Sequence, residues 1–374
     1  GTDMLYFAVA RDGHDGGVQI TASHNPKEYN GIKMVRKEAF PLSGEAGIND
    51  IRDMIAKGAI PPPAAKPGTL SQADVVDDYV KHVLSFIDIS IIKPFNVVLD
   101  AGSGIAGMVA PLLFKHIPTK KLTTLCFDVD GTFPNHEANP LIEENRIDIT
   151  ERVIAEKADI GIAWDGDADR CFFIDGEGEF CDGDFVCALL ARAALAKNPG
   201  ATILYDPRSS RAVPDLVAAE GGRSALSRVG HAFFKLRMRE EGAVFGGEVS
   251  GHYYFRDFWC ADSGTIPALL MLELLSVDGR SLAELMSEFR SRYFISGEIN
   301  SEVDDPEAKL AEIAERYADG KQTTLDGISV DYPDWHFNVR PSNTEPLLRL
   351  NLESLISHED MEAKRDEVLG LIRT

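Results

Sequence analysis

Cysteine is scarce in this chain of 374 residues, and its cysteines are not arranged in pairs. No two are spaced as CxxC, and an odd number in a long chain indicates neither a disulfide framework nor a zinc site. Long apolar runs are also missing: none reaches the roughly 18 residues of a membrane-spanning helix, and the N-terminus has no basic-then-apolar signal profile. We therefore expect a protein of the reducing cytoplasm with no membrane partner. The five cysteines are Cys126, Cys171, Cys181, Cys187 and Cys260.

Basic residues are too few to balance the acidic ones. The chain has 38 Lys and Arg against 60 Asp and Glu, a formal net charge of −22, which repels nucleic acid unless a local basic patch overrides it. Nucleic acid is therefore not an expected partner. A hydrophobic fraction of 44% is ample for folded cores, and the length predicts two to four domains.

Apolar, strand-like runs alternate with helical stretches from about residue 73 to residue 241. This alternation is typical of βαβ units, so we predict an α/β fold with mostly parallel sheets that restarts after residues 182–184. From about residue 292 the pattern changes to an α+β block. Near the N-terminus, residues 5–10 (LYFAVA) are predicted to form a buried strand, and the proline-rich residues 61–68 a linker.

A polar loop at residues 21–26 (TASHNP) follows a predicted strand. Pro26 biases the residue before it away from helix, so Ser23 is expected on a constrained, exposed loop. A serine there can act as a nucleophile or phosphate carrier, assisted by His24 and Lys33. A plain polar turn is the alternative interpretation.

Three carboxylates alternate in residues 165–170 (DGDADR), just after an apolar strand. In an extended loop, Asp165, Asp167 and Asp169 can turn oxygens toward one point, as Mg²⁺ or Ca²⁺ requires. The pattern fails as an EF-hand loop. A solvated acidic turn is the alternative, although three like charges this close repel one another without a cation.

Two further loops carry polar groups suited to a phosphorylated sugar. Residues 246–252 (GGEVSGH) string hydrogen-bonding side chains between glycines, and the carboxylate of Glu248 can accept hydroxyl contacts. Residues 340–346 (RPSNTEP) place a guanidinium, hydroxyls and an amide between two prolines, which is typical of a phosphate clamp.

Two segments mimic other functions. Residues 102–107 (GSGIAG) fit the dinucleotide-binding pattern G-x-G-x-x-G, but Asp100-Ala101 separates them from the apolar strand. Residues 125–132 (LCFDVDGT) have the form of the haloacid-dehalogenase phosphatase motif, with Asp128 as the nucleophile. That motif usually opens its domain, whereas a complete βα unit precedes it here. The phosphatase stays open as the rival hypothesis.

Taken in order, TASHNP, DGDADR, GEVSGH and RPSNTEP resemble the α-D-phosphohexomutase superfamily, most closely its bacterial phosphomannomutase/phosphoglucomutase branch. The resemblance implies repeated three-layer α/β units with mixed sheets and a C-terminal α+β domain around a central cleft. It implies four domains: residues 1–68, 69–175, 176–290 and 291–374.

The resemblance also implies a reaction and its residues. Hexose 1-phosphate and hexose 6-phosphate, of mannose or glucose, would interconvert through a phosphoserine and a hexose 1,6-bisphosphate, which also serves as activator. Mg²⁺ would be held by Ser23, Asp165, Asp167 and Asp169. The implied catalytic residues are Ser23, His24, Lys33, Arg170 and His252. The implied substrate-binding residues are Arg208, His231, Glu248, Ser250, Arg340, Ser342, Asn343 and Thr344.

One departure from the family pattern concerns the N-terminus. Family members begin with a strand and an arginine-containing loop that this chain does not show, so residues 1–68 are expected to be a remnant of the first domain. A truncated chain that binds sugar phosphate without catalysis is therefore a second alternative. Either a monomer or a homodimer is compatible with the sequence.

Overall fold

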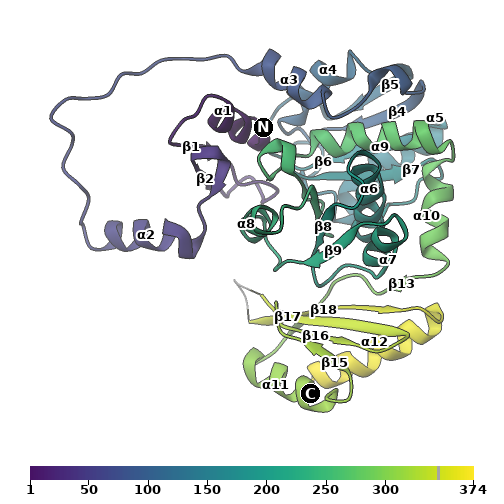
Figure 1. The fold of residues 1–374 in the computed structure, drawn as a ribbon. Coiled ribbons are helices and arrows are strands. Elements are labelled where there is room, and N and C mark those ends of the chain that lie inside the picture. The colour runs from purple at the N-terminus through teal and green to yellow at the C-terminus, as the bar shows by residue number, and fades with distance from the viewer. Residues whose placement is uncertain (343–345) are drawn as a thin grey trace.

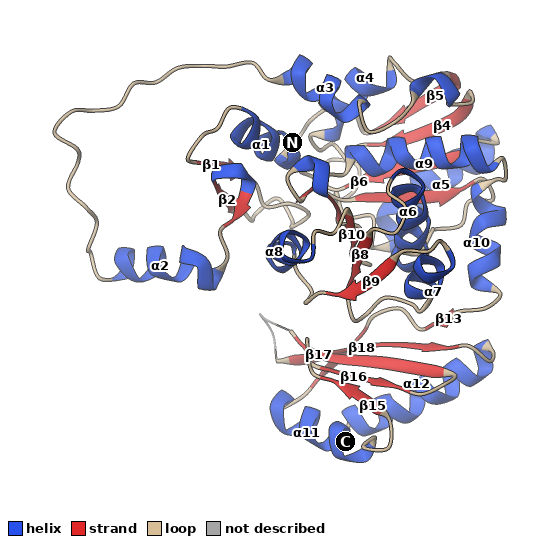
Figure 2. Ribbon diagram, viewed as in Figure 1, coloured by secondary structure: helices blue, strands red, loops and turns tan. Residues whose placement is uncertain are grey.

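The computed structural model describes residues 1–342 and 346–374, and its strands form four separate sheets (Figures 1 and 2). We call the four sheets with their helices the first to fourth blocks, in chain order. The predicted fold class is confirmed: α/β units with mixed sheets are followed by an α+β block. Five short helical turns lie between the main elements: η1 (Lys37–Ala39), η2 (Gly44–Ile48), η3 (Ile89–Ile91), η4 (Glu143–Arg146) and η5 (Arg256–Phe258).

The first block holds a small antiparallel sheet in the order β1-β2-β3, in which Ile20 pairs with Ile32. Its elements are α1 (Thr2–Arg11), β1 (Gly16–Ile20), β2 (Ile32–Arg36), β3 (Phe40–Pro41) and α2 (Asn49–Ala56). Residues 57–75, which include the predicted proline-rich linker, form an exposed connection that loops away from the other blocks (Figure 1).

The strand predicted at residues 5–10 is wrong, because these residues lie inside α1. Asp3, Tyr6, Phe7 and Val9 are buried, a spacing that follows the helical repeat and not the alternation of a strand. Asp3 fixes the start of the helix by accepting hydrogen bonds from Tyr79 Oη (2.6 Å) and Ser263 Oγ (2.8 Å). A short run of apolar residues is ambiguous between helix and strand when read from sequence alone.

The second block has the sheet order β5-β4-β6-β7. β4 is parallel to both β5 and β6, whereas β7 is antiparallel to β6. All five residues of β6 are buried, which explains its continuous apolar sequence. The elements are α3 (Val76–Leu84), β4 (Phe95–Asp100), α4 (Ala106–Phe114), β5 (Thr119–Leu125), α5 (Ile147–Glu156), β6 (Ile160–Trp164) and β7 (Cys171–Asp175).

The third block has the sheet order β12-β11-β10-β8-β9, parallel at β10-β8-β9 and antiparallel at β12-β11-β10. Its core joins those of the first and second blocks in one apolar cluster that runs from Tyr6 to Tyr293. The elements are α6 (Gly183–Lys197), β8 (Thr202–Tyr205), α7 (Ala212–Ala219), β9 (Arg223–Leu226), α8 (His231–Glu241), β10 (Phe245–Gly247), β11 (Tyr253–Phe255), β12 (Ala261–Asp262), α9 (Thr265–Asp278) and α10 (Leu282–Arg290).

The fourth block is antiparallel, in the order β13-β18-β17-β16-β15 with β14 also paired to β18, and it has its own core between Ile313 and Ile372. Figure 1 shows α11 and α12 on the side of this sheet that is turned away from the other blocks. The elements are β13 (Phe294–Ile295), β14 (Ile299–Glu302), α11 (Pro306–Arg316), β15 (Lys321–Thr323), β16 (Ile328–Asp331), β17 (Trp335–Pro341), β18 (Leu347–Ser354) and α12 (His358–Ile372).

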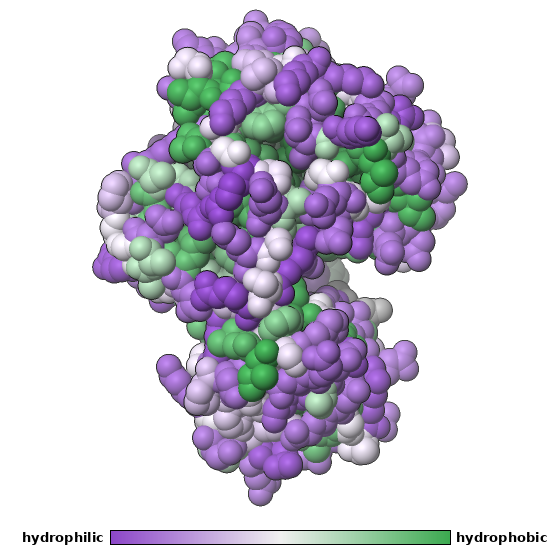
Figure 3. Space-filling model, turned by 90° about the vertical axis from the view of Figure 1, so that its right-hand side faces the viewer, coloured by the Kyte–Doolittle hydropathy of each residue, from purple (hydrophilic) through white to green (hydrophobic). Residues whose placement is uncertain are grey.

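Polar contacts attach the fourth block to the third. Arg211, just before α7, donates to the carbonyls of Tyr332 (2.5 Å), Pro333 (3.0 Å) and Trp335 (3.1 Å) in the turn between β16 and β17. The chain itself crosses between the blocks at residues 291–293, and the Val229 N–H donates across them to Asp326 Oδ2 at 2.8 Å. Figure 3 shows a largely hydrophilic face that narrows between the two parts. The fourth block is therefore a separate body held at few places.

Candidate active site

Ser23 lies on the loop between β1 and β2, half-buried and with a backbone φ of 55°, which non-glycine residues seldom adopt. Its Oγ donates to Asp165 Oδ2 at 3.0 Å and lies 3.1 Å from His24 Nδ1. Thr21 ties the loop to the second block, because its Oγ1 accepts from the Ser23 N–H (2.8 Å) and donates to Asp167 Oδ2 (3.1 Å). The predicted serine and the predicted metal loop are thus in direct contact.

Two glycines allow this close approach. A Cβ on Gly166 would lie 2.4 Å from the carbonyl oxygen of Ser23, and one on Gly104 would lie 2.7 Å from the carbonyl oxygen of Gly166. The Ile105 N–H also donates to the Gly166 carbonyl at 3.0 Å. Gly104, in the segment that mimics a dinucleotide motif, therefore allows close packing of the backbone against the metal loop.

The three carboxylates of the 165–170 loop converge as predicted. Asp165, Asp167 and Asp169 are buried, and one oxygen from each lies within 4.8 Å of the others. Among the described residues, Asp167 Oδ1 and Asp169 Oδ1 have no hydrogen-bond partner although both are buried. Buried carboxylate oxygens without partners are costly, and a hard divalent cation would satisfy them. The donor set therefore fits a Mg²⁺ ion.

Two cations hold this acidic cluster together. Lys33 Nζ, from β2, donates to Asp167 Oδ2 (2.7 Å) and to Asp169. Burial lowers the pKa of Lys33, but these carboxylates outweigh burial and raise that pKa well above its ordinary value. Arg170 Nε donates to Asp165 Oδ2 at 2.9 Å. Burial nevertheless raises the pKa of Asp165 to about 7, whereas Arg170 pulls in the opposite direction. Lys33 therefore stays protonated and cannot serve as a base at neutral pH.

The predicted sugar loop lies next to the acidic cluster. His252 Nε2 is 3.6 Å from Asp169 Oδ1, and its Nδ1 is 3.2 Å from Ser250 Oγ. Burial, with Arg170 as the next cause, holds the pKa of His252 well below its ordinary value. Burial and Arg170 likewise lower the pKa of His24 to about 4. Both imidazoles are therefore neutral at pH 7.

Glu248 is buried behind this loop. Its carboxylate accepts from the Gly230 N–H (2.7 Å) and from Tyr254 Oη (2.6 Å), and burial raises its pKa to about 7. Arg208 Nη2 lies 3.7 Å from Glu248 Oε1. Glu248 therefore sits between the sugar loop and the arginines described next.

Arg340, at the end of β17, is buried and reaches the same region from the fourth block. Its Nη2 donates to Glu298 Oε2 at 2.9 Å, and Arg208 Nη1 lies 3.8 Å from the same oxygen. Charged side chains and the neutral His252, from three blocks, thus form a continuous series from the acidic cluster to the predicted phosphate clamp. Its members in order are Asp169, His252, Glu248, Arg208, Glu298 and Arg340.

Three residues of this region were not predicted from the sequence. Asp206 accepts two hydrogen bonds from Arg208, at 2.9 and 2.8 Å, and so fixes the direction of that guanidinium. Glu298 joins Arg340 to Arg349, whose Nη1 lies 3.1 Å from Glu298 Oε1. Asp206, two residues before Arg208, could have been found from its spacing, but Glu298 and Arg349 have no local sequence signal.

The remaining residues that the sequence predicted for the site, and the rival nucleophile Asp128, lie in the following positions. His231 begins α8 with an exposed side chain, and Ser342 follows β17, where its Oγ lies 3.5 Å from Arg349 Nη2. Asn343 and Thr344 lie outside the described residues. Asp128 is exposed in the loop after β5, an edge strand of its sheet, so the phosphatase hypothesis is not favoured.

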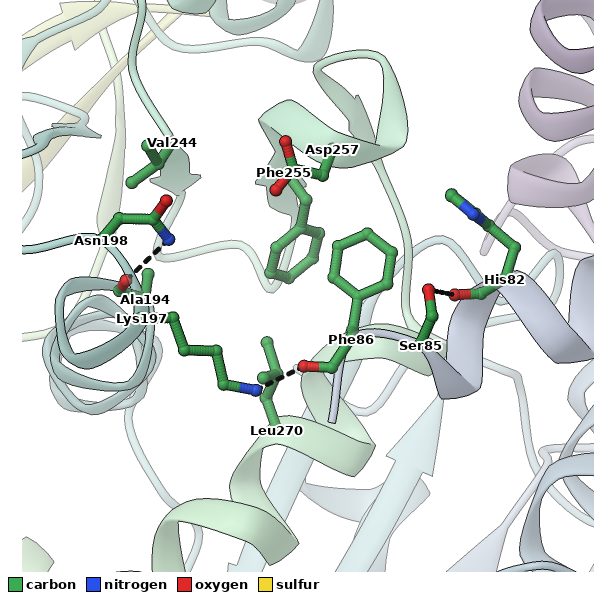
Figure 4. Close-up of a pocket in the computed structure, with 10 residues that line it drawn as sticks. All are labelled: His82, Ser85, Phe86, Ala194, Lys197, Asn198, Val244, Phe255, Asp257 and Leu270. Carbon is green, nitrogen blue, oxygen red and sulfur yellow. Dashed lines mark hydrogen bonds between the residues drawn. The ribbon is translucent and has the colours of Figure 1, made fainter. Parts of the chain in front are cut away.

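A pocket of about 340 Å³ between α3, α6 and β11 contains none of these residues (Figure 4). Its polar side chains are engaged with the protein itself: Lys197 binds the Phe86 carbonyl and Glu273 (2.5 Å), and Asn198 donates to the Ala194 carbonyl at 3.1 Å. Among the described residues of the pocket, His82 Nε2 is buried without a hydrogen-bond partner, and this single group is the exception. Among the described residues, no helix is both long and apolar enough to cross a membrane.

Comparison of the sequence with models of known protein families identifies the family. Family models of phosphoglucomutase/phosphomannomutase match most of the chain in order: α/β/α domain I at residues 1–60, domain II at 77–178, domain III at 182–293 and the C-terminal domain at 298–371.

Two relatives and one solved structure are similar over nearly the full chain. A phosphomannomutase of Escherichia coli is 43% identical over all of this chain and 84% of its own length. A protein of Xanthomonas campestris described as phosphohexose mutases is 45% identical over all of this chain and 83% of its own length. A phosphoglucomutase/phosphomannomutase family protein from Burkholderia thailandensis superposes with a TM-score of 0.83 at 32% identity, covering 96% of this chain and 76% of that chain.

Proposed function

The chain belongs to the phosphoglucomutase/phosphomannomutase family, and on that premise we propose that it interconverts hexose 1-phosphate and hexose 6-phosphate, with mannose or glucose as the sugar. The reaction would pass through phosphorylated Ser23 and a hexose 1,6-bisphosphate. The observation that carries this proposal is the contact of Ser23 Oγ with Asp165 Oδ2 at 3.0 Å, at the edge of the buried carboxylate cluster.

We infer that Asp165, Asp167 and Asp169 hold Mg²⁺, because their buried oxygens include two without a partner among the described residues. When bound, the ion would neutralise phosphate charge and polarise the phosphoryl group. Ser23 is near enough for its phosphate to complete the ligand set. Metal affinity should therefore rise when Ser23 is phosphorylated.

The protein side chains have separate tasks in the transfer. A sugar hydroxyl attacks the phosphorus of phosphoserine, the bond from phosphorus to Ser23 Oγ breaks, and the hydroxyl proton passes to a base. His252 would be the base for that proton, because its imidazole lies beside the acidic cluster, 3.6 Å from Asp169 Oδ1. Lys33 and Arg170 remain charged and stabilise the phosphoryl oxygens.

The part of the substrate that does not react would be held by the series of side chains that runs from Asp169 to Arg340. Glu248 and Ser250 would accept and donate hydrogen bonds to sugar hydroxyls, and His231 borders the same loop region. Arg208 and Arg340, with Ser342, would bind the phosphate that does not react. Both substrate orientations would use the same contacts, because the sugar must turn over between the two transfers.

A coupled assay of hexose 1-phosphate turnover, with hexose 1,6-bisphosphate as activator, tests the proposal. Ser23→Ala should abolish multiple turnover, and excess chelator should stop the wild-type reaction. Asp128→Asn is the control and should retain turnover, since Asp128 is exposed on an edge-strand loop. Full activity of Ser23→Ala together with an inactive Asp128→Asn would instead establish the phosphatase chemistry. A wild-type chain that binds sugar phosphate but never turns it over would establish the non-catalytic alternative.

A further inference from the structure

Glu298 is the point where three arginines from two blocks meet. It lies in the linker between β13 and β14, and its carboxylate contacts Arg340 Nη2 (2.9 Å), Arg349 Nη1 (3.1 Å) and Arg208 Nη1 (3.8 Å). A carboxylate surrounded by guanidinium groups has the charge and the geometry of a bound phosphate oxygen pair. Glu298 therefore offers these arginines the contacts that an anionic ligand would offer.

Not every donor at this point is satisfied by the described residues. Arg208 is already neutralised by its two hydrogen bonds to Asp206, whereas Arg340 and Arg349 share the single charge of Glu298. Within the part of the chain that the structure describes, Arg340 Nε and Arg349 Nε are buried and have no hydrogen-bond partner. Among the described residues, Arg340 and Arg349 thus have two N–H donors that Glu298 does not satisfy, and a phosphate offers more oxygens to accept from them than a carboxylate does.

Glu298 is placed so that it can leave. Its side chain is 28% exposed, whereas the Arg340 and Arg208 side chains are 9% and 6% exposed. Gly297, the preceding residue, has a φ of 68° and no neighbour within 4 Å of an added Cβ. Arg208 and Arg340 are therefore enclosed, whereas the carboxylate, which is as exposed as Arg349 (28%), stands on an uncrowded segment open to solvent.

We propose that Glu298 is an internal counter-ion that occupies the position of the unreactive phosphate and must be displaced when a phosphorylated ligand binds. The proposal rests on the function proposed above for Arg340. Glu298 acts as a positioning residue: it keeps the arginines together when no phosphate is present and lowers the affinity for phosphate by competing with it. Each release of the sugar bisphosphate then returns the arginines to a partner that is already in place.

Titration calorimetry with inorganic phosphate tests this displacement without needing turnover. Glu298→Gln removes the charge, whereas Glu298→Asp keeps the charge and withdraws it by one methylene group. Both variants should bind phosphate about twofold to fivefold more tightly than the wild type, since a partly exposed ion pair no longer competes. Glu302→Gln is the matched control, because Glu302 is exposed on β14 four residues further on, and its affinity should not change.

The same variants separate competition from a purely structural role. In turnover assays, Glu298→Gln should lower KM for either hexose phosphate without raising kcat, whereas a structural residue would lower the melting temperature and raise KM. Phosphate affinity that stays the same or weakens in Glu298→Gln would overturn the inference. Tighter phosphate binding by Glu298→Gln but not by Glu298→Asp would also overturn the inference. The carboxylate would then weaken phosphate binding by its charge alone, from a distance, without occupying the phosphate position. Absence of mutase turnover in the wild type would count against the proposed function alone.

Discussion

Replacing Gly166 with alanine tests whether close backbone packing places the reactive serine. The new Cβ would lie 2.4 Å from the Ser23 carbonyl oxygen, and real Cβ atoms essentially never approach within 3.0 Å of another atom. The two loops must therefore separate by roughly 0.6 Å or more, which at the strain typical of overpacking costs about 1–3 kcal/mol. The same displacement lengthens the 3.0 Å contact between Ser23 Oγ and Asp165.

Because misplacing a reacting group by about 1 Å costs roughly 100-fold in rate, we expect Gly166→Ala to lower kcat about 10-fold to 100-fold. The assay is coupled turnover at saturating hexose 1-phosphate, at a temperature where circular dichroism shows the variant fully folded. Gly131→Ala is the control, since nothing lies within 4 Å of a Cβ at that position. A wild-type kcat in Gly166→Ala, or an equal loss in Gly131→Ala, would refute the claim that this glycine positions Ser23.

Two further predictions concern charge. Lys33→Met leaves Asp167 and Asp169 without their shared cation, so the free energy of unfolding, measured in chelator, should fall by about 3 kcal/mol. Saturating Mg²⁺ should restore part of this loss, and an equal loss with and without Mg²⁺ would contradict the prediction. His136 donates to Asp100 at 3.0 Å, which outweighs burial and raises its pKa to about 9. The pair's stabilisation should be complete below about pH 6.5 and lost as the pH rises through 9. In urea unfolding, the free energy of unfolding of the wild type should exceed that of His136→Gln by about 2 kcal/mol less at pH 9.5 than at pH 6, after allowance for solvent screening. A difference that does not change with pH would argue against the ion pair.

The sequence predicted those elements whose hydrophobic pattern is local. The apolar, strand-like runs predicted between residues 73 and 241 include β4, β6 and β8, because buried parallel strands are continuous apolar runs bounded by polar turns. Helix α9 was not predicted: twelve of its fourteen residues are buried, so it has no polar face from which a helical repeat can be recognised. The run at residues 5–10 was assigned to a strand for the same reason, since its apolar character has no visible period.

The candidate site divides in the same way. The resemblance named Ser23, the three aspartates and Arg340, and the structure brings these residues into one series of contacts. Glu298 could not be predicted, because its partners Arg208, Arg340 and Arg349 lie 90, 42 and 51 positions away in the chain. A single carboxylate acquires such a role only from the folded arrangement.

The attachments of the fourth block have a consequence for its motion. Besides the chain at residues 291–293, the block is held by Arg211 at the turn between β16 and β17, by the Val229 N–H on Asp326 Oδ2 (2.8 Å) and by the 3.8 Å approach of Arg208 to Glu298. Polar contacts of this kind can be exchanged for contacts with water at little net cost. If the cleft opens and closes, the block would then move as one body and carry Arg340 with its sheet, so the phosphate clamp is brought to the acidic cluster without being rebuilt.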